Sequence, residues 1–191
     1  LYIIDGIDSV VRRSFDDGDS WSVFGDAPPI PAPSIVTMGR SGGGTLYAGA
    51  YINEGNAAGM GLEKGNHIYR SDDDGATWVH ASSWDSGSTV PALCGSASIL
   101  YGTDSQGNVY RSSDLGVTMP KVGQWDALGG KAACAVSPSG GVLFIDSVYC
   151  GSPSEDGCAA AWWSNDMGAT ASPVGNYAVD GGGIKAAVAV D

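Results

Sequence analysis

The sequence lacks a long uninterrupted apolar run. Its longest apolar-leaning stretch, residues 132–145, is interrupted by Ser137, Pro138, Ser139 and two glycines, and it is shorter than the roughly 20 residues that a transmembrane helix needs. Thirty glycines are spread through the 191 residues, so no segment keeps the periodicity of a long amphipathic helix. The sequence therefore predicts short strands joined by turns, in one globular domain that is not inserted in a membrane.

Basic residues are also scarce. The chain has 9 Lys and Arg residues against 21 Asp and Glu residues, which gives a formal net charge of -12. Binding to nucleic acid needs clustered Lys and Arg to neutralise phosphates, so neither nucleic acid nor an acidic membrane surface is an expected partner. Most of the acidic residues are Asp, whose short side chain hydrogen-bonds nearby backbone N–H groups in turns.

The four cysteines lack the C-x-x-C spacing that zinc and redox sites use. Cys150 and Cys158 bracket a short loop and are predicted to form a local disulfide, which leaves Cys94 and Cys134 as the second pair. Two disulfides indicate an oxidising location, secreted or at the cell surface; four reduced thiols in a cytosolic core are the alternative. The chain begins with Leu1 and shows no leader, as expected after removal of a signal sequence or in an excerpt of a longer chain.

One short motif, Ser-x-Asp-x-Gly-x-Ser/Thr-Trp, occurs four times, and we call each copy a box. Boxes 1 and 2 are complete, whereas boxes 3 and 4 have Met119 and Ala171 in the place of the Trp. A repeat of this kind indicates an architecture of similar supersecondary units. The shared residues are Ser14, Asp16, Gly18, Ser20 and Trp21 in box 1; Ser71, Asp73, Gly75, Thr77 and Trp78 in box 2; Ser112, Asp114, Gly116 and Thr118 in box 3; and Ser164, Asp166, Gly168 and Thr170 in box 4.

The boxes resemble the Asp-box, or BNR, repeat of sialidases, sortilin-type receptors, some xyloglucan-cleaving enzymes and many secreted propellers. This resemblance implies an all-β fold, a β-propeller of four-stranded antiparallel blades in which each box joins the third strand of a blade to the fourth. The chemistry suits a tight turn, because a hydroxyl and a carboxylate can satisfy backbone N–H groups and Gly can adopt a positive φ. The Trp is expected to hold the outgoing strand on the blade.

Each repeat contains candidates for four strands. Stretches of period two precede the boxes and are the candidate third strands: residues 10–13, 67–70, 108–111 and 161–163. A Leu-aromatic pair marks the candidate second strand in each repeat: Leu1-Tyr2, Leu46-Tyr47, Leu100-Tyr101 and Leu143-Phe144. Apolar segments are the candidate innermost strands: residues 34–38, 91–95, 132–136 and 184–190. The expected blades of this single domain, residues 1–191, are approximately 1–27 with 184–191, 28–85, 86–126 and 127–180.

The repeats alternate in length, because the box aspartates Asp16, Asp73, Asp114 and Asp166 are 57, 41 and 52 residues apart. The extra residues fall in the connections 50–66 and 148–158, which lie opposite the boxes in a propeller. The segment 184–190 is expected to complete the first blade. Three arrangements satisfy this expectation: closure of a four-bladed ring by the same chain, donation of the strand to the next copy in a fibre, and membership of a longer propeller.

Three aromatic residues, Trp84, Trp125 and Tyr177, recur at one fixed distance along the chain after the serines of boxes 2, 3 and 4. They could stack on sugar rings or pack between blades, and packing is favoured. The following Asp85 and Asp126 are the candidates for a pair of glycosidase carboxylates, although no catalytic residue is expected. Sialidase activity is not expected either, since the arginines at 13, 70 and 111 precede box serines and belong to the repeat.

No metal or cofactor is expected. Asp72, Asp73 and Asp74 could suggest calcium, but they lie within box 2 and lack a distal Glu. His67 and His80 have no further ligand at a suitable spacing. The sequence thus predicts a non-catalytic extracellular structural or assembly module that associates with itself by strand exchange. The alternative is a glycan-binding or glycoside-hydrolase-like propeller, or a fragment of one, with polysaccharide as the partner.

Overall fold

A computed structural model gives the architecture of most of the chain. In four segments, residues 36–40, 146–148, 158–160 and 175–178, it describes the backbone only. The described residues form strands and turns, and no helix among them has the length and hydrophobicity to cross a membrane. The described residues are 1–5, 8–30, 36–40, 44–54, 59, 61–84, 92–96, 98–104, 106–125, 133–137, 139–148 and 158–178.

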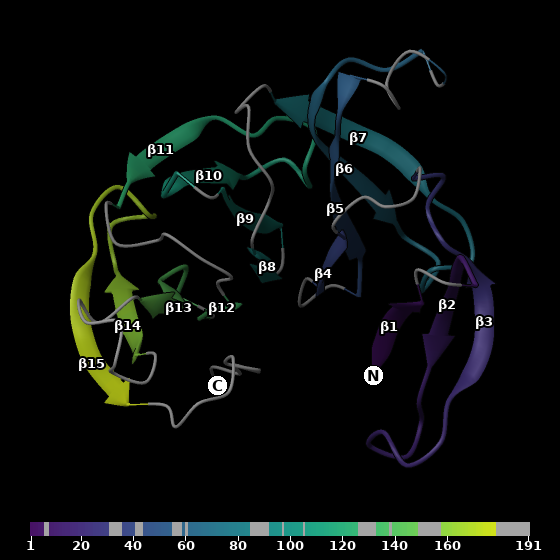
Figure 1. Cartoon of the computed structure of the whole chain (residues 1–191), viewed down its shortest axis with the longest axis horizontal. Coiled ribbons are helices and arrows are strands. Elements are labelled where there is room, and N and C mark those ends of the chain that lie inside the picture. Colours follow the sequence, from purple (N-terminus) through teal and green to yellow (C-terminus); the bar gives the residue numbers. More distant parts are fainter. Residues whose placement is uncertain are drawn as a thin grey trace.

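The strands form four antiparallel sheets, each in simple up-and-down order (Figure 1). Sheet 1 contains β1 (Tyr2–Asp5), β2 (Val10–Arg13) and β3 (Ser22–Asp26). Sheet 2 contains β4 (Val36–Arg40), β5 (Leu46–Ile52), β6 (Gly65–Ser71) and β7 (Val79–Trp84). Sheet 3 contains β8 (Ala92–Ser96), β9 (Ile99–Thr103), β10 (Asn108–Ser112) and β11 (Lys121–Gln124). Sheet 4 contains β12 (Ala133–Val136), β13 (Val142–Val148), β14 (Cys158–Ser164) and β15 (Ser172–Ala178).

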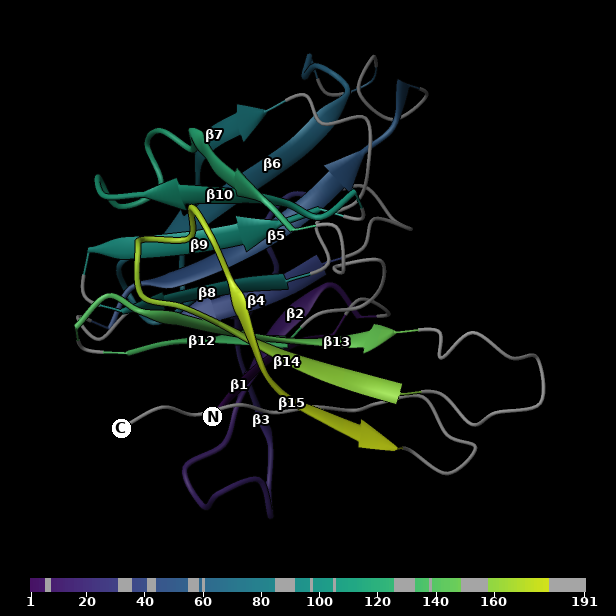
Figure 2. The same cartoon turned by 90° about the vertical axis from the view of Figure 1, so that its left-hand side faces the viewer.

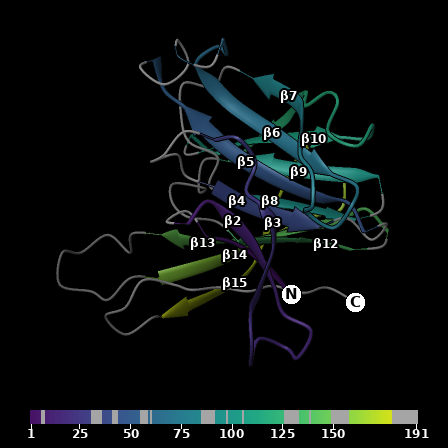
Figure 3. The ribbon, with the colours of Figure 1, turned by 90° about the vertical axis from the view of Figure 1, so that its right-hand side faces the viewer.

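The four sheets form an open arc around a common centre, with β4, β8 and β12 on the inside and β3, β7, β11 and β15 on the outside (Figure 1). Contacts between β1 and β4, β4 and β8, and β8 and β12 join neighbouring sheets. In the side views the strands of sheets 2, 3 and 4 run between two opposite edges of the molecule (Figures 2 and 3). The predicted strand 184–190 lies outside the described residues, so closure of the arc and strand donation both stay predictions.

The core consists of apolar layers between neighbouring sheets. Tyr47 and Ile68 of sheet 2 pack against Leu93, Leu100 and Met119 of sheet 3. A second layer lies between sheets 3 and 4 and contains Ala92, Cys94, Tyr101, Val109, Trp125, Val136, Val142 and Phe144. A single sheet cannot bury its own apolar faces. Burial of these layers between neighbouring sheets is therefore the main source of the stability of the stack.

The register of sheet 4 differs from that of sheets 2 and 3. Leu46 and Leu100 pair with the box serines of their sheets. In sheet 4 the residue opposite the box Ser is Val142, so the pair Leu143-Phe144 is displaced by one residue. Because side chains alternate between the faces of a strand, this displacement turns Phe144 toward sheet 3.

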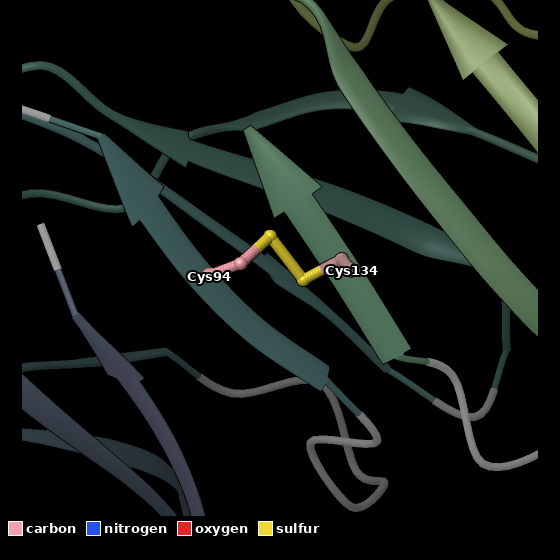
Figure 4. Close-up of a disulfide and its surroundings, with 2 residues drawn as sticks. All are labelled: Cys94 and Cys134. Carbon is pink, nitrogen blue, oxygen red and sulfur yellow. A yellow bond between two sulfur atoms is a disulfide. The ribbon is translucent and has the colours of Figure 1, made fainter. Parts of the chain in front are cut away.

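The disulfide between Cys94 and Cys134 joins the inner strands β8 and β12 (Figure 4). The Cα atoms are 5.7 Å apart, although the two residues are separated by 40 positions in the sequence. The sequence prediction for this pair is therefore confirmed. Cys150 and the side chain of Cys158 lie outside the described residues, so their pairing stays a prediction.

Candidate functional site

The four boxes adopt one hydrogen-bonded turn at the same edge of the sheets. In each, the Ser hydroxyl donates to the box Asp at 2.6–2.8 Å and accepts from the N–H of the box Gly at 2.7–2.9 Å. The Asp carboxylate also accepts the N–H of the Ser or Thr four residues later, at 2.8–3.0 Å. The glycines have φ between 83 and 103°, a region that favours Gly. These polar groups are thus used within the turn.

The serine of each box is expected to contribute measurably to stability. Ser112 is fully buried, donates to Asp114 and accepts from Gly116, so Ser112→Ala leaves a buried N–H without its acceptor. We expect a loss of about 1–3 kcal/mol in the free energy of unfolding, measured by urea denaturation. Ser113→Ala is the matched control, because the neighbouring Ser113 is exposed. Equal stability of the two variants would contradict this role of the box.

Hydrogen bonds lower the pKa of all four box aspartates to about 2. In boxes 1, 2 and 4 the largest cause is the hydroxyl of the following Ser or Thr, and in box 3 it is the hydroxyl of Ser112. A general acid needs a pKa raised toward the working pH. The box carboxylates therefore have the properties of structural groups.

Stability is expected to decrease in acid because of these aspartates. Their pKa is about 2 in the folded chain and 3.8 ordinarily, so their stabilisation is complete above about pH 5 and is lost as the pH falls through the folded value. Urea denaturation between pH 7 and pH 2 measures this loss. Asp114→Asn removes one titrating group and should flatten the dependence below about pH 4. An unchanged dependence in this variant would refute the assignment.

Boxes 2, 3 and 4 also pack against the preceding sheet, a role that the motif itself does not indicate. A Cβ added at Gly75 would lie 3.2 Å from Val11 of sheet 1, and one added at Gly168 would lie 3.1 Å from Tyr101 of sheet 3. The outer strands approach the boxes as closely: a Cβ at Gly25 would lie 2.6 Å from the carbonyl oxygen of Gly75. Gly123 has the same relation to Gly168. The signal in the sequence is a Gly that recurs at one fixed distance after the box Ser in the outgoing strands of sheets 1, 3 and 4, whereas Ser82 holds this place in sheet 2.

The three aromatic residues Trp84, Trp125 and Tyr177 occupy equivalent places at the edge opposite the boxes. Trp84 pairs with Asn66, and Tyr177 pairs with Ala159, five residues before the box Ser in both sheets. The N–H of Trp125 donates to Gly107 at 2.8 Å, which is the same place in sheet 3. The side chain of Tyr177 lies outside the described residues. The other two rings differ in their exposure.

Trp125 packs between sheets 3 and 4. Its side chain is 5% exposed, its ring is perpendicular to that of Phe144 at 5.0 Å, and its indole N–H donates to the carbonyl of Gly168 at 3.1 Å. Of the two sequence interpretations, packing between blades therefore describes Trp125. A ring held in this way has no free face for a sugar.

Trp84 is half-buried, at the end of β7. Its ring is tilted by 38° against that of Tyr110, with centroids 5.0 Å apart, and lies between sheets 2 and 3. The same edge carries Asp104, which the sequence analysis did not single out. Asp104 is fully buried and accepts hydrogen bonds from Asn108 and Tyr110, so it fixes the turn between β9 and β10 under the ring.

The three aspartates considered as calcium ligands have different partners. Asp73 belongs to the box turn, Asp72 forms an ion pair with Arg70, and Asp74 accepts hydrogen bonds from Tyr2 and Arg13. In the part of the chain that the structure describes, no group of three His, Cys, Asp or Glu residues is arranged to hold a metal ion. The candidate carboxylates Asp85 and Asp126 lie outside the described residues.

The two histidines form a pair on neighbouring strands. His67 is buried, and its Nε2 lies 2.8 Å from the carbonyl oxygen of Glu63, so Nε2 donates. Its Nδ1 then accepts from Nε2 of His80 at 2.9 Å. Burial and the neighbouring His67 lower the pKa of His80. These contacts account for both rings: His67 is a packed strand histidine and His80 an exposed one.

Four antiparallel sheets with inner and outer strands around one centre define a propeller-type fold. No family model and no curated protein matches the sequence. The fold is similar to that of a protein of unknown function from Dyadobacter fermentans, with 20% identity, 94% of this chain and 55% of that chain covered, and a TM-score of 0.53. It is also similar to NanB sialidase from Streptococcus pneumoniae, with 16% identity, coverages of 90% and 28%, and a TM-score of 0.54.

A third similar structure is an α-L-arabinofuranosidase from Fusarium graminearum, with 14% identity, coverages of 89% and 58%, and a TM-score of 0.52. At these identities the similarity concerns the fold alone. The chain spans between 28% and 58% of the length of the three proteins. The all-β, propeller-type fold is thereby confirmed, whereas a ring of four blades stays a prediction.

Proposed function

We propose that the protein is an extracellular glycan-binding module of the Asp-box propeller type, which binds through the edge that carries Trp84. The main observation behind this proposal is that Trp84, which packs against Tyr110, is only half-buried, whereas the equivalent Trp125 is buried. A ring that is only partly buried offers apolar surface for contact with a sugar. Similar folds in a sialidase and an arabinofuranosidase, and a disulfide that fits an oxidising compartment, support the proposal.

Binding is expected to weaken about tenfold in Trp84→Ala, because one stacked ring contributes about 1.4 kcal/mol. Affinity electrophoresis of the chain against plant, algal and bacterial polysaccharides identifies the ligand, and calorimetry measures the change. Trp21→Ala is the matched control, since Trp21 is partly exposed at the box edge. The proposal fails if no polysaccharide binds, or if both variants bind as the wild type does.

A second candidate function is self-assembly into a surface or fibrous polymer. The observation that favours it is a group of exposed apolar side chains on one face of sheet 1: Leu1, Ile3 and Val23. Monomeric proteins rarely leave such faces uncovered. Negative-stain electron microscopy of the native material is the test: fibres are expected, and discrete particles would exclude a polymer.

A further inference from the structure

Sheets 2 and 3 each pack between two others, so each has a preceding face, toward the sheet before it in the chain, and a following face, toward the sheet after it. In sheet 3 the preceding face carries Leu100 and Met119, which contact sheet 2. The following face carries Tyr101 and Val109, which contact sheet 4. Sheets 1 and 4 therefore each have one face toward a neighbouring sheet and one face at an end of the arc.

The preceding face of sheet 1 carries exposed apolar side chains around an ion-paired Arg12, and no described sheet covers it. Leu1 is 62% exposed, whereas the equivalent Leu46 and Leu100 are 1% and 0% exposed. Trp21 is 36% exposed, whereas the equivalent Met119 is 7% exposed. Pairing of β1 with β2 and of β2 with β3 places the exposed Ile3 and Val23 in one row of this face, on either side of Arg12, which forms ion pairs with Asp5 and Asp8.

The following face of sheet 4 is the counterpart. Leu143 pairs with Trp163, in the place that Tyr101 and Arg111 hold in sheet 3. Tyr101 is fully buried by sheet 4, whereas Leu143, Ile145 and Trp163 are only half-buried. A Trp thus replaces the Arg of the other three sheets. In the described part of this face, sheet 4 therefore has Leu143, Ile145 and Trp163 where sheet 3 has Tyr101, Thr103 and Arg111.

The glycine that permits contact with a following box is also present in sheet 4. Gly25 and Gly123 hold equivalent places after the box serines of their sheets, and they touch the glycines of boxes 2 and 4. Gly175 holds the same place in β15. The box that remains without a preceding sheet is box 1. Among the described residues, a Cβ added at its Gly18 would have only Leu1 and Trp21 of the same sheet within 4 Å.

We infer that the preceding face of sheet 1 binds the following face of sheet 4 of a second copy of this chain. This contact continues the interface that already joins sheets 1 and 2, 2 and 3, and 3 and 4. Within one chain the two faces lie at opposite ends of the open arc (Figure 1). Leu1 and Ile3 are exposed on one face, and Leu143, Ile145 and Trp163 are half-buried on the other. Because the faces differ, the contact is head to tail and can propagate. The inference rests on the second candidate function and does not need a donated strand.

Light scattering of the full chain after size-exclusion chromatography, from about 1 to 100 μM, tests the contact. The wild type is expected to exceed the monomer mass and to grow with concentration. Ile3→Asp blocks one face and Ile145→Asp blocks the other, so each variant alone should be monomeric. An equimolar mixture keeps one intact face of each kind and should give dimers and nothing larger. Val79→Asp is the control, because Val79 is an exposed apolar residue on the outer strand of sheet 2, away from both faces.

A monomeric wild type overturns the inference, and so does a mixture that stays monomeric. Circular dichroism shows whether the variants fold. If they do not, the exposed Val23→Asp replaces Ile3→Asp, and Gly175→Val, which blocks the close approach, replaces Ile145→Asp. If electron microscopy still shows fibres of these variants, the chain assembles through another contact. The assembly function then stands and this interface is refuted. Glycan binding should be equal in Ile3→Asp and the wild type, which separates this test from that of Trp84.

Discussion

Replacing Cys94 and Cys134 together by Ala is expected to lower the free energy of unfolding by about 4 kcal/mol. The disulfide closes a loop across 40 positions, and a loop of that length restricts the unfolded chain by about this amount. It joins the inner strands of sheets 3 and 4, which share the larger apolar layer. Urea denaturation of the oxidised wild type and of the double variant measures the difference.

The control for this prediction is the same comparison in a reducing buffer. The wild type should then lose most of its advantage over the double variant, because the bond is absent from both. Any other disulfide is reduced equally in the two proteins and does not affect the difference. A variant that is as stable as the oxidised wild type would show that the sheets hold together without the bond.

The boxes were predictable because their chemistry is local. All the hydrogen bonds of the turn are made within about eight residues, by Ser, Asp, Gly and Ser or Thr at fixed spacing. The motif alone therefore predicts the turn. The register of sheet 4 was not predictable in this way. Val142, Leu143, Phe144 and Ile145 are all apolar, and a run without alternation does not indicate which residues face which sheet.

The aromatic residues show a second limit. Their constant spacing from the box Ser predicted their place in the sheets, and the pairing of Trp84 agrees with it. Spacing along the chain contains no information about the distance between sheets, so it could not separate the buried Trp125 from the half-buried Trp84. That distance depends on contacts between residues of different repeats, such as Gly123 and Gly168.

This dependence makes Gly123→Ala the most disruptive small substitution in the described part of sheet 3. The new Cβ would overlap the carbonyl oxygen of Gly168 and lie 2.8 Å from that of Ala169. Both neighbours are backbone atoms of box 4, so no side chain can rotate away, and the sheets must separate. The indole of Trp125, which donates to the same Gly168 carbonyl, would lose its hydrogen bond. We expect a loss of about 3 kcal/mol in the free energy of unfolding.

Thermal and urea denaturation measure this loss, and Trp fluorescence reports the environment of Trp125. Gly59→Ala is the matched control, because a Cβ at Gly59 has no atom within 4 Å. It should leave stability within about 0.5 kcal/mol of the wild type. If Gly123→Ala behaves like this control, sheets 3 and 4 are not held by contact between the outer strand and the box. The proposal that Gly175 permits an equally close contact between two copies of the chain would then lose its support as well.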